Sequence, residues 1–466
     1  MQLLRRRSDH AYYSNVLALP RSYVSEQQLA GALTYDLGKK KGLYQAYAED
    51  AGHYLVPRNY IQPAAFRALP FPVVDARLRR FPRVRFKSDI VLDGRDLSQN
   101  FQREGVAAML AADNGILSLR CGAGKTICCI HAIHLLQTPA LVLVTDKGLA
   151  EQWTEEILEH TDLGPDDIGF IGDGTFSWIG KKITIGLVQT VAGRAVKETL
   201  PPEMLWWFGV VVCDEAHTTA GPAYFGQAVS PFPGRRWGLS ATPSRNDGFN
   251  SLLRYTIGPV VYSYLEPELT PAIYFRRLDT QLNTHDVSVK RAISDVTGEV
   301  HLQKVYSYLA TRDDRVSIIA KEIRAAVKKQ REILVLSQSR AMLERLEQLF
   351  PDAGIVHGGI DDRKERLRRI RECNPVIATS SLGRQALNKP KLDLVLVLEP
   401  FSDAGVLQQL LGRVQRKYEG KPTPVAVFYD DIHIERMHRI TMKMRRLFAR
   451  WPDNQGGRLR WQNTGP

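Results

Sequence analysis

The sequence predicts an α/β protein with two parallel sheets in tandem, preceded by a small N-terminal α/β module. From about residue 95 onward, short apolar runs alternate with longer stretches of helical character. The runs are apolar throughout, which is typical of parallel strands covered by helices on both faces. The alternation pauses over the polar residues 262–310 and then resumes, so it forms two series. The 466 residues are enough for two to four domains.

Residues 1–90 are expected to form the small module. It contains two strand-like runs and one helical segment, which stand at 12–20, 53–61 and 25–37. Prolines cluster between Pro57 and Pro82, which predicts an extended connector at the end of the module. We expect the module to be separable, so that deleting it leaves a folded core.

The two strand series define the larger domains. The first domain is expected at 91–250, with buried strands at 115–119, 140–145, 182–188, 209–214 and 236–241. A linker at 251–275 leads to the second domain at 276–434, with strands at 331–337, 353–358, 375–380, 392–400 and 424–430. Residues 435–466 are expected to form a basic helix and a glycine-rich tail.

The stretch "LRCGAGKTICCI" at 119–130 stands between a strand and a helix of the first domain. A glycine loop in this position aims backbone N–H groups and a helix N-terminus at one point, which suits a phosphate. Lys125 is expected to reach the terminal phosphates of a nucleotide, and Thr126 to ligate Mg²⁺. The remaining loop residues that would hold the nucleotide are Gly122, Ala123 and Gly124. Leu119 replaces the first glycine of the usual pattern.

An acidic pair follows a later strand of the same domain, in "GVVVCDEAH" at 209–217. We expect Asp214 to hold Mg²⁺ against the phosphates and Glu215 to orient the attacking water. Together with the glycine loop, this pair predicts a nucleotide hydrolase.

These motifs resemble those of a known family. "GAGKT", "DEAH" and "GLSATPSRNDG" are similar to motifs I, II and III of the superfamily two helicases and translocases. Further matches follow in the family's order over roughly residues 95–430. They are the adenine-contacting glutamine element at 101–106, motif Ia at 141–153, a strand that meets the nucleic-acid backbone at 185–191, and motifs IV, V and VI at 333–339, 376–396 and 408–416.

The resemblance implies two RecA-like domains that bind ATP and Mg²⁺ and move along nucleic acid. Arg413 and Arg416 would act as arginine fingers, with Gln102 and Gln409 also at the nucleotide. Ser240 and Thr242 would link hydrolysis to domain movement. The nucleic-acid contacts would be Lys147, Gln152, Gln189, Thr190, Ser337 and Thr379. Motif V departs from the family pattern, because Gln385, Ala386, Leu387 and Asn388 stand where relatives usually read E-G-L-D.

Several details resemble the XPB and UvsW kind of DNA-repair and phage helicases, notably "CGAGKT", "EQW" and "SATPSRNDG". This branch implies an ATP-dependent DNA helicase or branched-DNA translocase that acts in repair, recombination or replication. Two alternatives stay open: an RNA helicase, and a translocase motor subunit of a restriction or defence complex. We expect a monomeric motor.

The net charge is +13, which favours a polyanionic partner such as DNA. The charge is concentrated at the ends, because residues 1–95 hold 16 Lys/Arg and 8 Asp/Glu. The densest run, 77–87, interleaves arginines with phenylalanines, and a strand there would place the arginines on one face. The run is therefore a candidate grip on duplex DNA. The alternatives are a solvated basic face and a connector whose arginines pair with acidic residues.

Cysteine spacing and hydropathy exclude other classes. The five cysteines form no CxxC, so neither a disulfide framework nor a zinc ribbon is expected. The cluster "CCIHAIH" at 128–134 would point its side chains around a helix rather than toward one metal ion. The sequence contains no apolar run long enough for a membrane span and no signal peptide, which predicts a cytoplasmic protein of a prokaryotic or phage-infected cell.

Overall fold

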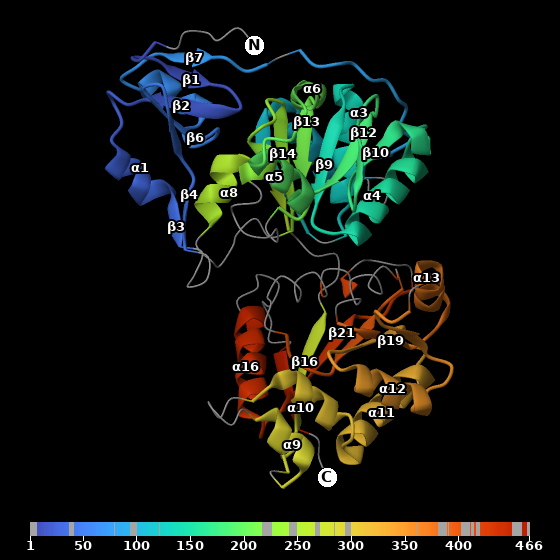
Figure 1. Ribbon diagram of the computed structural model, residues 1–466. Helices are drawn as coiled ribbons and strands as arrows, with labels where there is room; N and C mark the ends of the chain where they lie inside the picture. Colours follow the sequence, from blue (N-terminus) through green and yellow to red (C-terminus); the bar gives the residue numbers. More distant parts are fainter. Residues whose placement is uncertain are drawn as a thin grey trace. The chain divides into compact units, whose positions relative to one another are not determined.

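The computed structural model describes residues 7–36, 42–78, 80–93, 100–120, 122–216, 226–241, 249–265, 271–283, 285–293, 300–360, 362–380, 389, 391–401, 411, 414–415, 420–449 and 459–463. The chain divides into two compact units, Met1–Leu265 and Glu266–Pro466. Figure 1 shows the elements of each unit.

The N-terminal module is built on a mixed sheet in the order β5-β6-β2-β1-β7. Its strands are β1 (Ala11–Tyr13), β2 (Val16–Pro20), β5 (Ala48–Asp50), β6 (His53–Pro57) and β7 (Val73–Asp75). The module also holds α1 (Glu26–Leu33), a two-stranded ribbon of β3 (Thr34–Asp36) and β4 (Leu43–Gln45), and the 3₁₀ turn η1 (Pro63–Ala68). Ser25 and Gln28 form a capping box that begins α1.

The first unit also contains an eight-stranded sheet in the order β11-β10-β12-β9-β13-β14-β8-β15. Only β11 pairs antiparallel. The strands are β8 (Asn114–Leu119), β9 (Ala140–Val144), β10 (Ile168–Gly172), β11 (Thr175–Ser177), β12 (Ile183–Leu187), β13 (Val210–Cys213), β14 (Arg235–Ser240) and β15 (Val260–Tyr264). The helical elements are α2 (Phe101–Ala111), α3 (Lys125–Leu136), α4 (Lys147–His160), η2 (Pro165–Asp167), α5 (Val188–Val196), α6 (Pro202–Trp207) and α8 (Asn250–Thr256).

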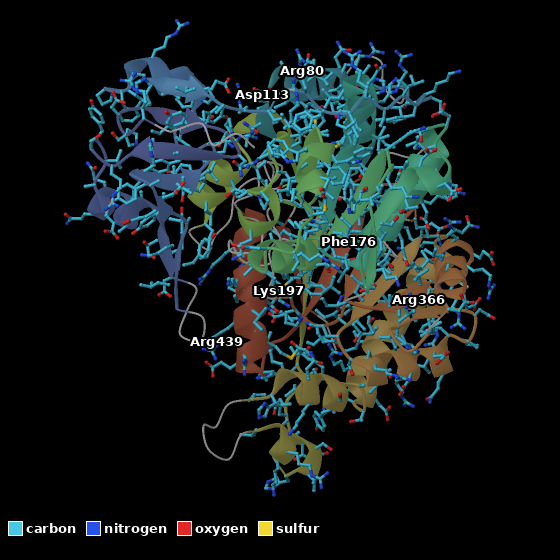
Figure 2. All side chains as sticks on the ribbon, turned by 45° about the horizontal axis from the view of Figure 1, so that its top comes forward. Arg80, Asp113, Phe176, Lys197, Arg366 and Arg439 are labelled. Atoms are coloured by element: carbon cyan, nitrogen blue, oxygen red, sulfur yellow. The ribbon has the colours of Figure 1, made fainter. Side chains whose placement is uncertain are left out.

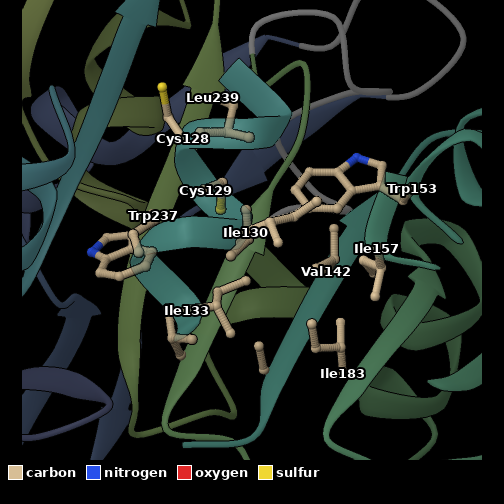
Figure 3. Packing of buried hydrophobic residues seen from close by; sticks show 14 of the residues in the cluster. Cys128, Cys129, Ile130, Ile133, Val142, Trp153, Ile157, Ile183, Trp237 and Leu239 are labelled. Carbon is tan, nitrogen blue, oxygen red and sulfur yellow. The ribbon is translucent and has the colours of Figure 1, made fainter. Parts of the chain in front are cut away.

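Both faces of this sheet are buried. Side chains of α3 and α4 pack on one face, where Trp153 and Ile157 meet Val142 and Ile183 (Figure 3). Side chains of α5, α6 and α8 pack on the other face, where Val191 meets alternate residues of the same strands. The continuously apolar runs in the sequence follow from this double coverage.

The second unit contains a seven-stranded parallel sheet in the order β18-β19-β17-β20-β21-β16-β22. Its strands are β16 (Ala272–Leu278), β17 (Ile333–Ser337), β18 (Gly354–Val356), β19 (Val376–Thr379), β20 (Leu394–Val397), β21 (Val425–Asp431) and β22 (Leu459–Asn463). Its helices are α9 (Val287–Ala292), α10 (Leu302–Leu309), α11 (Asp313–Lys328), α12 (Arg340–Leu349), α13 (Arg363–Glu372) and α16 (Glu435–Ala449). Helices α11 and α12 cover one face, and α13 and α16 contribute to the core on the other.

The predicted fold class, two tandem parallel-sheet domains with a small N-terminal α/β module, is confirmed. The domain boundaries stay predictions, to which the structure adds three facts. Strand β15, inside the expected linker 251–275, pairs with β8 in the first sheet, and β16 already belongs to the second. The glycine-rich tail contains β22, which pairs with β16. The expected C-terminal helix is α16.

The module does not stand apart from the first sheet. Arg58 is 2% exposed and donates hydrogen bonds to the carbonyls of Pro233 (2.5 Å) and Gly234 (2.7 Å), just before β14. Arg236, inside β14 and fully buried, donates to the carbonyl of Asn15 (2.5 Å) in the module. Asn59 contacts Asn114 at the start of β8 (3.2 Å). These buried polar contacts tie the module to the first sheet and argue against a separable module, because deleting it would leave Arg236 without one of its acceptors.

The basic run also differs from its expectation. The described residues 80–93 contain no strand, only an isolated bridge between Ser88 and Thr161. The chain instead runs as an extended strap, residues 80–89, along the ends of α3 and α4. Val84 N–H donates to the carbonyl of Gln137 (3.1 Å), and Phe86 is buried in the core beside His134. Inward and outward side chains still alternate, so Arg83, Arg85 and Lys87 share an exposed side.

Candidate active site

The glycine loop joins β8 to α3, as the sequence predicts. Gly122 and Gly124 have φ values of 81° and 80°, a left-handed conformation that favours glycine. A Cβ on Gly124 would lie 2.7 Å from Nε2 of Gln102. Lys125 opens α3, and its ammonium folds back onto the carbonyl of Leu119 (3.3 Å). Backbone N–H groups of the first turn of α3 thus face the loop, which is the arrangement that binds phosphate.

Gln102 lies against this loop. Its Nε2 donates to the carbonyl of Ala123 (2.9 Å), and its Oε1 accepts from the N–H of Asp93 (2.6 Å). The buried Asp93 carboxylate in turn accepts from the N–H groups of Gln102 (2.9 Å) and Arg103 (3.2 Å), which caps the start of α2. The pair therefore connects α2 with the glycine loop.

The acidic pair follows β13 on the same edge of the sheet. Asp214 is 6% exposed, and burial, reinforced by repulsion from Glu215, raises the pKa of its carboxyl group to about 6. Its Oδ2 accepts from the indole N–H of Trp153 (2.8 Å), and its Oδ1 accepts from the N–H of Glu215 (2.8 Å). Glu215 has a φ of 47°, a left-handed conformation that is uncommon and costs energy in a non-glycine residue.

The predicted nucleic-acid residues of the first unit lie at that edge too. Lys147 is exposed at the first turn of α4, directly after β9, and lies 3.6 Å from Asp173. Gln152 is half-buried one turn further along α4. Gln189 and Thr190 begin α5 after β12, and Gln189 donates to the carbonyl of Thr145 (3.1 Å). The parallel strands β8, β9, β12, β13 and β14 all end here, so their loops gather on one edge.

The coupling residues are described in part. Ser240 ends β14 beside Ser118 of β8 and is fully buried. Thr242 lies outside the described residues. His217 of the "DEAH" stretch does so too.

In the second unit, Ser337 ends β17 and Thr379 ends β19 at one edge of that sheet. Thr379 is half-buried. Ser337 is fully buried, and its hydroxyl donates to the carboxylate of Glu399 (2.7 Å), which does not fit the expected direct contact with nucleic acid. The expected arginine fingers Arg413 and Arg416, together with Gln409 and residues 385–388 of motif V, lie outside the described residues.

Sequence patterns do not identify three residues whose buried polar contacts the structure shows. Trp153 stands out only as part of the family-like "EQW", although an isolated tryptophan within "AEQWTEE" is itself unusual on a polar helix. Asp93 belongs to no recognisable pattern. Arg315 on α11 is fully buried between Asp431 (3.0 Å) and Glu399 (3.6 Å), and only the folded sheet brings these three together.

Within the described ranges, no group of three or more His, Cys, Asp or Glu residues is arranged to hold a metal ion. Cys128 and Cys129 are buried in the core, and His134 contacts the carbonyl of Phe86 (2.9 Å). Among the same residues, no helix is long and apolar enough to cross a membrane.

The fold and the glycine loop together define a P-loop nucleotide hydrolase with two parallel-sheet domains. The sequence matches the family "Type III restriction enzyme, res subunit" over residues 95–245 and the family "Helicase conserved C-terminal domain" over residues 314–418. The two matches cover most of the two sheets.

Individual proteins resemble the chain over most of its length. The "DNA 3'-5' translocase XPB2" of Sulfurisphaera tokodaii is 25% identical over 411 residues, which cover 80% of this chain and 86% of that protein. "Probable helicase D10" of Escherichia phage T5 is 22% identical over 324 residues, or 68% of this chain and 67% of that one. The structure of S. cerevisiae Dbp5 bound to RNA and ADP BeF3 has a TM-score of 0.52 and 15% identity over 78% of this chain and 88% of that one, so it supports the fold.

The chain belongs to the superfamily two helicases and translocases, whose motor consists of two RecA-like domains. It is therefore an ATP-hydrolysing enzyme.

Proposed function

We propose that this chain is a DNA helicase or branched-DNA translocase that couples ATP hydrolysis to movement along DNA. The observation that carries the proposal is the gathering of Lys125, the Asp214–Glu215 pair and the exposed starts of α4 and α5 on one edge of one sheet. A nucleotide and a nucleic-acid strand bound at this edge would contact neighbouring loops. DNA is preferred because the S. tokodaii relative is named as a DNA translocase.

Each residue at this edge has a proposed role. Lys125 neutralises the terminal phosphates, and the N–H groups of residues 122–126 orient them. Glu215 polarises the attacking water. Gln102 orients the base. Ser240 and Thr242 couple hydrolysis to movement.

The remaining site residues are proposed from the family resemblance. Arg413 and Arg416 supply positive charge to the transition state, and Gln409 supports them. Lys147, Gln152, Gln189, Thr190 and Thr379 bind the nucleic-acid backbone, while Ser337 shapes its loop through Glu399.

The donor set fits a magnesium ion. Thr126 offers a hydroxyl on the first turn of α3, and Asp214 offers a buried carboxylate, the hard oxygen ligands that Mg²⁺ prefers. When bound, Mg²⁺ supplies positive charge to the phosphates. The protein's part is to hold Asp214 in one orientation, which its two hydrogen bonds do.

The strap of residues 80–89 supplies a second proposed contact with DNA. Arg80, Arg83, Arg85 and Lys87 are exposed, and in the described part of the chain their side chains have no hydrogen-bond or ion-pair partner. The alternative, in which arginines of the run pair with acidic residues, holds for Arg77, which is bonded to Asp75 and Asp113. The unpaired cations can therefore take phosphates without breaking an existing ion pair.

A cavity of about 250 Å³ opens beside the strap, and the side chains that line it are mainly cationic among those that carry a charge. It is lined by Arg58, Arg77, Arg83 and Arg235, against one carboxylate, that of Asp113. Figure 2 shows the side chain of Arg80 at the same end of the first unit as Asp113. This end is the edge where the strands begin, so the strap would hold duplex away from the strand bound at the opposite edge.

A process that needs such a motor is the remodelling of branched DNA in repair, recombination or replication, and we propose one of these as the setting. A monomer is sufficient for the activity. DNA would be the only required macromolecular partner.

The proposal is tested by measuring ATP hydrolysis with single-stranded DNA, duplex DNA, a DNA junction and RNA at equal nucleotide concentrations. We expect stimulation by DNA and ATP-dependent displacement of a strand or movement of a junction. The Glu215→Gln protein is the control for contaminating hydrolysis. Stimulation by RNA alone would replace the proposal with an RNA helicase. Duplex-dependent hydrolysis without strand separation or junction movement would indicate a restriction-type translocase.

A further inference from the structure

Trp153 makes a specific contact with the acidic pair from inside the hydrophobic core. Its side chain is 1% exposed and packs beside Val142, Ile157 and Ile183 (Figure 3). Its indole N–H donates to Oδ2 of Asp214 over 2.8 Å. Both groups are buried, so the bond joins an N–H donor to a carboxylate in surroundings of low dielectric constant, where such bonds are stronger than in water.

The contact fixes the orientation of Asp214. Oδ1 is held by the N–H of Glu215 at 2.8 Å, so each carboxylate oxygen accepts one hydrogen bond. Each oxygen has two lone pairs, and the bonds leave one on each for a further ligand. Without the indole, Oδ2 would lose its donor and the carboxylate could rotate about its Cβ–Cγ bond.

A second tryptophan in the same core shows that the ring can be buried there for packing alone. Trp237 of β14 is fully buried in the same cluster, on the other side of α3 residues Cys129 and Ile130 in Figure 3. Its indole nitrogen has no hydrogen-bond partner among the described residues. Trp153 and Trp237 are thus matched in burial and differ in the bond to the acidic pair.

Helix α4 links this contact to the predicted nucleic-acid edge. Lys147 begins the helix and Gln152 immediately precedes Trp153. A displacement of α4 by bound nucleic acid would move the indole, and with it the carboxylate to which it is bonded.

We infer that Trp153 is a positioning residue that holds the Asp214 carboxylate for Mg²⁺ and ties it to helix α4. The inference rests on the proposed function, because it assigns Asp214 to the metal. Trp153 itself contacts neither nucleotide nor metal in this role.

The test compares Trp153→Phe with the matched control Trp237→Phe. The affinity for a fluorescent ADP is measured in Mg²⁺ and in EDTA, and the ratio of the two is the readout. Changing residues that orient metal ligands typically lowers metal affinity roughly 10–100-fold. For Trp153→Phe we expect the affinity in Mg²⁺ to fall by about that range, while the affinity in EDTA stays at the wild-type value. Trp237→Phe should keep the wild-type ratio.

A second readout follows the link to α4. The fold-stimulation of ATP hydrolysis by DNA should decrease in Trp153→Phe and stay unchanged in Trp237→Phe. If the smaller ring prevents folding, benzothienylalanine at position 153 replaces only the N–H by sulfur and preserves the shape of the side chain. The same loss is expected from this variant.

A wild-type Mg²⁺ ratio in Trp153→Phe would overturn the inference, and so would an equal loss in Trp237→Phe, which would indicate packing alone. Failure of the proposed function looks different. In that case DNA would not stimulate hydrolysis by the unaltered protein, whereas the loss of Mg²⁺-dependent ADP binding in Trp153→Phe would remain.

Discussion

Arg58 of the N-terminal module donates a 2.7 Å hydrogen bond to the backbone carbonyl of Gly234, which directly precedes a central strand of the first sheet. The same guanidinium bonds the carbonyls of Ser14 (2.6 Å) and Pro233 (2.5 Å). Burial lowers its pKa to about 10, which leaves it charged at neutral pH. A buried cation held by carbonyls of both parts joins the module to the sheet that carries the nucleotide loop.

Replacing Arg58 should therefore destabilise the first unit. Arg58→Ala leaves several buried carbonyls without a donor, and we expect the free energy of unfolding to fall by on the order of 3 kcal/mol. Chemical unfolding followed by tryptophan fluorescence measures the change. Arg21→Ala is the control, because Arg21 and its partner Glu49 are both about half exposed, and such a pair contributes about 1 kcal/mol or less.

An equal effect of the two substitutions would show that the module packs only loosely on the sheet. The same contacts predict that deleting residues 1–90 gives a poorly folded protein, since the deletion also removes Phe86 from the core. A truncated protein with the wild-type melting temperature would contradict this.

The acidic pair and the glycine loop make separate predictions for hydrolysis. Lys125→Ala should abolish turnover, because the phosphates lose their cation. Glu215→Gln should retain binding of ATP and lose hydrolysis by about 100-fold or more, because an amide cannot take the proton of the water. Equilibrium binding of a fluorescent ATP analogue and steady-state hydrolysis separate the two effects. Turnover at the wild-type rate in Glu215→Gln would remove Glu215 from its role as base.

The strands that the sequence predicts are those that are apolar on both sides. Strand β16 escapes prediction because Arg276 and Arg277 interrupt its apolar pattern, and Arg276 finds its partner Glu322 on a distant helix (3.0 Å). Strand β15 escapes it because the strand lies at the edge of its sheet, where its residues are exposed or half-exposed. Local patterns do not encode these long-range partners.

The same limit applies to the site. Gly122–Thr126 and the acidic pair are predictable, because each is a short motif next to an apolar strand. The bond between Trp153 and Asp214 spans 61 residues, and no spacing rule connects them. Because Ser337 belongs to motif IV, the sequence predicts that it contacts nucleic acid at the surface. In the structure its hydroxyl is buried and donates a hydrogen bond to Glu399.

The buried cluster around Arg315 predicts a pH-dependent stability. In Arg315→Met, the buried carboxylates of Asp431 and Glu399 lose their cation, and we expect a loss of about 3–5 kcal/mol at neutral pH. Burial already raises the pKa of Glu399, which Arg315 opposes, so removing Arg315 raises it further. At low pH, such a carboxyl group is protonated in both the folded and the unfolded state and does not affect the free energy of unfolding. As the pH rises above the pKa that the group has in the unfolded state, the unfolded protein loses the proton first, and the free energy of unfolding falls.

The deficit of Arg315→Met relative to the unaltered protein should therefore be small near the unfolded pKa of a glutamate and grow toward neutral pH. Urea unfolding at several pH values measures it. Arg312→Met is the control, since Arg312 pairs with the half-exposed Asp314. A deficit that does not change with pH would show that poorer packing, rather than the unpaired carboxylates, causes it.

The strap gives the last prediction, which concerns DNA rather than ATP. Replacing Arg80, Arg83, Arg85 and Lys87 by glutamine removes four exposed cations that have no partner among the described residues, without disturbing the buried Phe86. Removing one cation from a phosphate reduces the slope of log affinity against log salt by about 0.9 for duplex DNA. We expect weaker binding of duplex and junction DNA and a slope that is shallower by roughly 2–4, with hydrolysis stimulated by single-stranded DNA unchanged.

The matched control replaces Lys290, Lys321, Lys328 and Lys329, which are equally exposed and unpaired within the described residues of the second unit. The control changes the net charge by the same amount. Equal losses of DNA affinity in the two proteins would therefore show that overall charge, rather than the strap, causes the effect. Unchanged junction affinity and salt slope in the strap variant would show that the strap only fastens the connector to the sheet.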